Sequence, residues 1–173
     1  MKRVLLLSVL LLVSIIGFSQ EMVVTTGSLD FLRDKSTAKV EFEYANATWE
    51  HDNDLPGFIQ TRLEDIEETF VEMFNKKSKT LKFEEKNKDS VKYKMVVHIE
   101  KIDGFFGWVT NGFGEMTMNL YGNIEVFNVA EENPICEIRL NRMKGRYDKI
   151  FYHRFYEIFE ALAMNLVKMG KTK

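Results

Sequence analysis

The side chains most often used in catalysis or metal binding are few in this chain and lie far apart. The histidines are His51, His98 and His153, and the only cysteine is Cys136. No two histidines have the spacing that places two ligands on one helix face, and neither an HExxH nor a CxxC motif occurs. The pattern therefore gives no support for a metal or a cofactor, and we expect none.

The remaining polar residues form no recognisable catalytic arrangement. The serines that follow residue 20 are Ser28, Ser36, Ser78 and Ser90. None lies in the glycine-flanked turn that presents a nucleophilic serine, and the acidic pairs have no spacing that defines the separation needed for acid–base catalysis. His51, Asp52 and Asp54 could hold a metal weakly, but an ordinary polar loop is the better interpretation. We therefore expect a protein that is not an enzyme.

The most distinctive segment is residues 104–114, GFFGWVTNGFG, which holds four of the ten glycines of the chain. Its aromatic side chains are Phe105, Phe106, Trp108 and Phe113. One interpretation is structural, because glycines permit a bulge and aromatic rings can cover a sheet edge. The other is functional, because loops with large apolar side chains are frequent partner sites. We predict that these four aromatic residues contact a partner.

The first twenty residues have the pattern of a secretory signal peptide. Two basic residues follow Met1, residues 4–16 are an apolar run, and small residues occupy positions 17 and 19. The run is shorter than the roughly 20 residues of a membrane span, although an uncleaved anchor is the alternative. No cysteine lies near the cut to carry a lipid. We predict cleavage after Ser19 or Gln20 and a periplasmic or secreted protein.

The charge that remains after this cleavage is mild. The full chain has 24 basic and 26 acidic residues, and residues 1–20 remove two basic residues and no acidic one, which leaves a net charge of −4. Nucleic-acid binding normally needs a basic face, so no such partner is expected. Cys136 cannot form an internal disulfide and lies in a strand-like run, where it is best interpreted as a small buried side chain.

Residues 21–173 are expected to form one domain of the α+β class. Alternation predicts strands over residues 39–49, 80–85, 91–102, 115–128 and 135–143, after an arm with a short strand piece around 23–26. Helical spacing predicts helices over 56–77, with Phe70 buried, and over 148–169, with Phe155 and Leu162 buried.

The order β-α-β-β-β-β-α predicts a two-layer sandwich. A mixed, mostly antiparallel sheet of four to five strands would carry both helices on one face. The first strand would lie parallel to a neighbour through a right-handed crossover that uses the first helix.

The other face of this sheet should be polar. Its expected residues are Lys92, Lys94, His98, Glu100, Thr117, Asn119, Tyr121, Asn123, Glu125, Glu137, Arg139 and Asn141. A solvated face with cross-strand pairs is the favoured interpretation. The alternative is a polar docking surface for an envelope partner or a glycan.

The runs GWVTNGFGEMTMNLYGNIEVFN and ICEIRLNRMKG, followed by a closing helix, resemble a group of small exported domains of unknown function from Gram-negative bacteria. The order of elements alone is also similar to the N-terminal domain of periplasmic TolB. The resemblance covers roughly residues 39–169 and implies a sandwich of the cell envelope, with no catalytic residues to carry over.

These observations favour a non-enzymatic exported module that binds an envelope protein or self-associates. Peripheral contact of this module with a membrane is a further possibility. The alternative is a carrier of an apolar small ligand between the sheet and the helices, because the chain has nine methionines and 14 phenylalanines. A well-packed core uses the same residues, so the carrier is the second choice.

Overall fold

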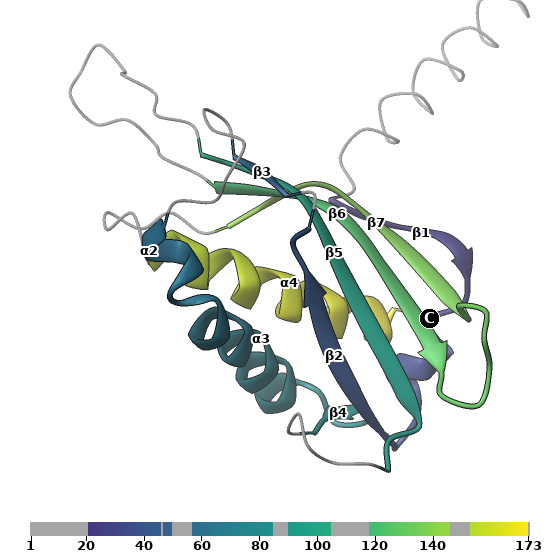
Figure 1. The fold of residues 1–173 in the computed structure, drawn as a ribbon. Coiled ribbons are helices and arrows are strands. Elements are labelled where there is room, and N and C mark those ends of the chain that lie inside the picture. Colours follow the sequence, from purple (N-terminus) through teal and green to yellow (C-terminus); the bar gives the residue numbers. More distant parts are fainter. Residues whose placement is uncertain are drawn as a thin grey trace, which may run out of the picture.

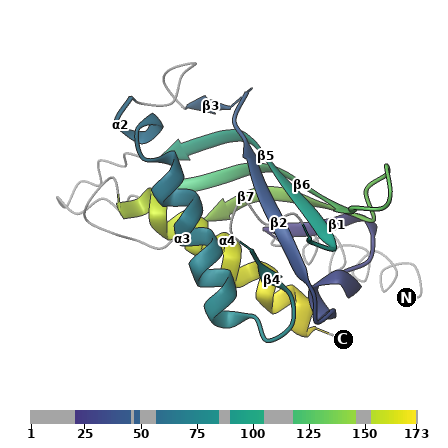
Figure 2. The same ribbon diagram turned by 60° about the horizontal axis from the view of Figure 1, so that its bottom comes forward.

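The computed structural model describes residues 21–45, 47–49, 57–84, 90–104, 118–145 and 153–172, with only the backbone of residues 58 and 59. A seven-stranded sheet carries two long helices on one face (Figure 1). The predicted class, an α+β sandwich, is confirmed, but the predicted count of four to five strands is too low. Figure 2 shows the same two layers after rotation, with α3 and α4 side by side under the sheet.

The strands are β1 (Met22–Gly27), β2 (Thr37–Glu43), β3 (Thr48–Trp49), β4 (Lys82–Phe83), β5 (Tyr93–Gly104), β6 (Met118–Asn128) and β7 (Cys136–Lys144). The helices are η1 (Asp30–Arg33, a 3₁₀ turn), α2 (Gly57–Gln60), α3 (Leu63–Lys77) and α4 (His153–Lys171). Strand order in the sheet is β1-β7-β6-β5-β2-β4, with β3 beside β5. The antiparallel β5-β6-β7 meander and the parallel pairing of β2 with β5 are as predicted.

The higher strand count has two sources. The N-terminal arm is a full edge strand, β1, which pairs with β7 more than a hundred residues later. The predicted strand 39–49 is two strands, because the chain turns at Ala45 and the N–H of Ala47 bonds the carbonyl of Tyr44 at 2.9 Å. Both halves nevertheless run beside β5.

The predicted helix 56–77 is also interrupted. Exposed Thr61 and Arg62 form a turn between α2 and α3. Among the described side chains of α3, Leu63 is half-buried against the core and full burial begins at Ile66.

The core lies between the sheet and the two long helices. Phe70 of α3 and Phe155 and Leu162 of α4 are fully buried, as predicted. The ring of Phe155 stacks on Trp49 with centroids 5.5 Å apart. Because these rings join α4 to β3, the helix layer and the sheet share one continuous core.

The pairing of β5 with β6 is irregular where β5 passes Gly122 of β6. A Cβ at Gly122 would lie 2.0 Å from the carbonyl oxygen of His98, so this close backbone approach requires glycine. The pairing register shifts between Ile99 and Lys101. The shift returns the following apolar residue, Ile102, to the buried face of the sheet, where it is 1% exposed.

Candidate functional site

The two edges of the sheet differ in how their backbone groups are satisfied. At the β4 edge, the side-chain amide of Asn75 donates to the carbonyl of Phe83 and accepts from its N–H, both at 2.8 Å. The Lys82 ammonium also bonds the carbonyls of Ser78, at 2.6 Å, and of Asn75. The end of α3 therefore closes β4, though not the part of β2 beyond it, to another strand.

The β1 edge is open. The N–H of Asn141 in β7 bonds the carbonyl of Glu21 at 2.8 Å. Backbone groups alternate in direction along an antiparallel strand, so Glu21 and Val23 face β7 while Met22 and Val24 face away from it. Within the described ranges, no hydrogen bond occupies these outward groups of Met22 and Val24. Such an edge is a template for another strand.

The sequence of β1, MVVTTG, lacks most devices that keep an edge strand apart from other chains. It has no charged residue and no proline, and its only such device is a register shift between Val24 and Thr26. By contrast, β2 carries Lys39, Glu41 and Glu43. Among these two strands, β1 is therefore the less protected.

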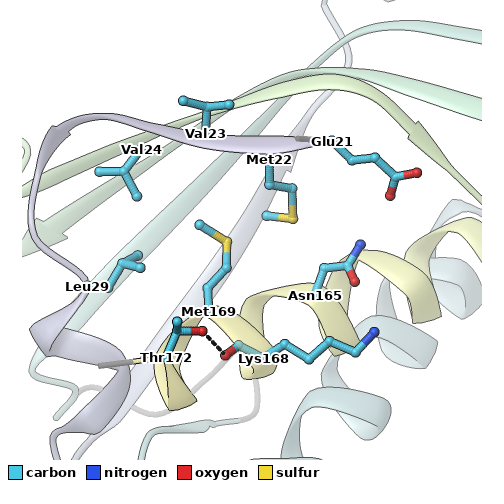
Figure 3. A pocket seen from close by; sticks show the side chains of 9 residues that line it. All are labelled: Glu21, Met22, Val23, Val24, Leu29, Asn165, Lys168, Met169 and Thr172. Atoms are coloured by element: carbon cyan, nitrogen blue, oxygen red, sulfur yellow. Dashed lines mark hydrogen bonds between the residues drawn. The ribbon is translucent and has the colours of Figure 1, made fainter. Parts of the chain in front are cut away.

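A groove of about 690 Å³ lies between β1 and the C-terminal turns of α4. Figure 3 shows Met22 and Met169 pointing toward one another across it, with Val24 and Leu29 toward one end. The polar residues that line the groove are Glu21, Asn165, Lys168 and Thr172. Its apolar part lies directly beneath the open strand edge, so one partner could occupy both.

The turn η1 fixes the end of α4 that forms this groove. Arg33 donates from Nε to the carbonyl of Gly170 at 3.1 Å and from a terminal nitrogen to the carbonyl of Thr172. A Cβ at Gly170 would lie 2.9 Å from the Cβ of Leu32, so the helix end packs closely on η1. The α4 wall of the groove is therefore held in place by its packing on η1.

On the opposite face of the sheet, charged side chains pair across the strands. Arg139 donates two hydrogen bonds to the carboxylate of Glu100, one of them 2.6 Å long. These hydrogen bonds hold the pKa of Glu100 below its ordinary value, although partial burial opposes the shift. The Nζ atom of Lys94 lies 2.7 Å from a carboxylate oxygen of Glu41.

His98 extends this network across three strands. Its Nδ1 lies 2.9 Å from Glu43 and its Nε2 lies 3.2 Å from Glu125. These contacts support the favoured interpretation, a solvated face whose charges satisfy one another.

Two residues expected on that face make contacts that the alternation did not predict. The ammonium of Lys92 donates a hydrogen bond to the carboxylate of Asp34 at 2.5 Å. This bond and a second one from the hydroxyl of Tyr93 lower the pKa of Asp34. Asn119 is only 3% exposed, and its Nδ2 donates to Asp103 at 2.6 Å. The alternation assigned Asn119 to the correct strand face but could not show that it is covered.

The predicted partner residues Phe105, Phe106, Trp108 and Phe113 lie outside the described residues, as do His51 and Thr117. The contact made by the four aromatic residues stays a prediction. Sequence reasoning missed the β1 edge as a candidate site. The available signal was the uncharged, β-branched run of residues 23–26, which begins shortly after the predicted cleavage point.

Two properties of the described residues bear on other classes of function. No group of three or more His, Cys, Asp or Glu side chains in this part of the chain could hold a metal ion. None of the described helices is long and apolar enough to cross a membrane. Cys136 is fully buried, and burial raises the pKa of its thiol to about 11.

No family model and no curated protein sequence matches this chain. Among solved structures, the PelC dodecamer from Paraburkholderia phytofirmans is similar with a TM-score of 0.52 and 10% identity, over 87% of this chain and 98% of that one. A dodecamer of a PelC variant from the same organism gives a TM-score of 0.49 and 9% identity, over 89% of this chain and 100% of that one.

Protein XCC0632 from Xanthomonas campestris, of the DUF330 family, gives a TM-score of 0.45 and 10% identity, over 84% of this chain and 87% of that one. At this level of identity, only the first PelC likeness bears on the argument, and it establishes the fold alone: this chain has a fold similar to that of PelC.

Proposed function

We propose that this protein is a non-enzymatic, exported module of the cell envelope whose molecules associate with one another at the β1 edge. The observation that carries the proposal is the open backbone of Met22 and Val24 beside the apolar groove. An unpaired, uncharged edge strand tends to pair with another chain. At the opposite edge Asn75 occupies the backbone of Phe83, and the part of β2 beyond β4 carries charged residues, so β1 is where such pairing would occur.

The similar fold of PelC supports self-association as the mode of action. PelC is described as a dodecamer, so this arrangement of strands and helices is compatible with a large assembly in that protein. The number of copies proposed for this chain does not follow from PelC, because the two sequences are only 10% identical.

Export is the second part of the proposal. It rests on the apolar run of residues 4–16 between a basic start and small residues at positions 17 and 19. N-terminal sequencing of the protein from the envelope fraction should begin at Gln20 or Glu21. A retained Met1 in that fraction would contradict cleavage.

The groove also supports a second candidate, the carrier of an apolar small ligand. It lies between the sheet and α4, and Met22, Val24, Leu29 and Met169 give it an apolar lining. Its open form, beside an exposed Lys168, fits a partner surface better than the enclosed pockets that bury most of a small ligand.

Native mass spectrometry of the purified protein distinguishes the two candidates. Self-association predicts a defined multiple of the chain mass that falls to one copy on dilution. The carrier predicts a single copy with extra mass of a co-purified ligand. A single copy without added mass at all concentrations would contradict both.

A further inference from the structure

We infer that two copies of the chain join by antiparallel pairing of β1 with β1 of the second copy, about a twofold axis at Val23. This inference rests on the proposed self-association and adds the partner strand and its register. Met22 and Val24 are two residues apart, and the backbone of each faces outward. A strand that runs in the opposite direction can present the same two residues in reverse order.

The hydrogen-bonding pattern selects this register. Opposite residues in an antiparallel ladder exchange both hydrogen bonds when both face the partner. Met22 of one copy can therefore exchange bonds with Val24 of the second copy, and the twofold axis repeats the exchange. Val23 then lies opposite Val23 of the second copy, in a pair whose Cα atoms are about 4.5 Å apart.

The side chains of β1 suit this pairing. Val23 is half-buried and is one of the residues that line the groove, but Figure 3 shows its side chain pointing away from α4, so two Val23 side chains would meet on the outer face of the joined sheet. Met22 and Val24 line the groove beneath the edge, so pairing would bring the apolar grooves of both copies together. Glu21 would lie opposite Thr25, which avoids a pair of like charges at this position.

The other edge is a poorer partner for β1. The N–H of Glu84 bonds the carbonyl of Ala38, so the even-numbered residues of β2 face the β4 side. β4 already occupies Thr37 and Ala38, which leaves only Val40 and Phe42 facing outward. The neighbouring Lys39 and Glu41 are charged, whereas β1 has no charged residue.

Disulfide cross-linking at Val23 tests the register. In full-length protein purified after export, Val23→Cys should give a covalent dimer on mild oxidation, because the expected Cα separation lies within the range of about 4.4–6.8 Å that disulfides span. Val129→Cys is the matched control, since Val129 is 57% exposed in the turn after β6. The native Cys136 is buried and its raised pKa keeps it out of the reaction.

A second variant, Val23→Lys, brings two cations together at the axis and should reduce the dimer fraction at least tenfold, which is about 1.4 kcal/mol. Dimer from Val23→Cys but not from Val129→Cys, with loss of association in Val23→Lys, supports the pairing. Wild-type assembly without a Val23→Cys dimer, or equal cross-linking of both cysteine variants, overturns the pairing and leaves self-association standing. Wild-type protein that stays a single copy overturns both.

Discussion

The side chain of Asn75 forms a reciprocal pair of hydrogen bonds with the backbone of Phe83, each 2.8 Å long. Asn75 lies in the last turns of α3, and Phe83 ends the edge strand β4. An amide group has the donor and the acceptor that a neighbouring strand would provide. One helix side chain thus takes the place of a further strand at this edge, while β1 at the other edge has no such substitute among the described residues.

Asn75→Ala should destabilise the protein by about 1–3 kcal/mol, because Phe83 is 4% exposed and its backbone groups would lose their partner. Urea unfolding followed by circular dichroism measures the loss. Lys76→Ala, at the next and exposed position of α3, is the control and should change the midpoint little. Equal midpoints for the two variants would show that water satisfies Phe83 equally well.

Phe155→Ala should cost about 3–5 kcal/mol, because it removes a fully buried ring from the core. The loss includes the stacking contact with Trp49. Glu68→Ala, on the exposed side of α3, should leave the thermal midpoint nearly unchanged. Similar midpoints for these two variants would mean that α4 does not anchor the core.

The pairing of Glu100 with Arg139 should make stability depend on pH. The pKa of Glu100 is lowered in the folded state, below its ordinary value of 4.5. Its contribution is therefore complete above pH 4.5 and is lost as the pH falls through the lowered folded value. Glu100→Gln should be less stable than wild type at neutral pH, and this difference should shrink in acid.

Denaturant midpoints at neutral pH and near pH 3 measure the change, with Glu68→Gln as the control. The effect should be small, because both side chains of the pair are more than 40% exposed. A stability difference between Glu100→Gln and wild type that is the same at both pH values would contradict this account.

The aromatic segment yields a separate prediction. With Trp49 replaced by Phe, which keeps an aromatic ring against Phe155, emission reports on Trp108 alone. We expect red-shifted, quencher-accessible emission that moves to the blue on self-association. Blue, protected emission in the dilute monomer, with unfolding of a Trp108→Ala variant, would assign the segment to the core.

Short-range patterns were enough to predict most of the fold. Alternation predicts that Val91, Tyr93, Met95, Val97 and Ile99 share one face of their strand; the last four are buried and Val91 is half-buried. It could not predict the register shift that returns Ile102 to the core, because the shift depends on contact with Gly122 of another strand. Periodicity describes one strand at a time, whereas a bulge belongs to a pair.

The candidate site was less predictable for a related reason. β1 pairs with β7 across more than a hundred residues, and such pairing leaves no local pattern. The groove forms only where η1, β1 and α4 pack together. Arg33 of η1 holds the end of α4 by hydrogen bonds to backbone carbonyls, and no sequence pattern predicts bonds of this kind. The role of Asn75 is likewise invisible, since an asparagine near a helix end is usually solvated.

The most direct test of the account is sedimentation velocity on the purified protein over a range of concentrations. The variant Val24→Pro removes an outward N–H that β7 does not use, and an edge strand tolerates proline at such a position. Val24→Ala is the matched control, because it shortens the same side chain and keeps the N–H. We predict that wild type and Val24→Ala sediment as assemblies while Val24→Pro sediments as a folded monomer. A wild-type monomer at every concentration, or a Val24→Pro assembly equal to that of wild type, would contradict the central claim that the open β1 edge joins the copies.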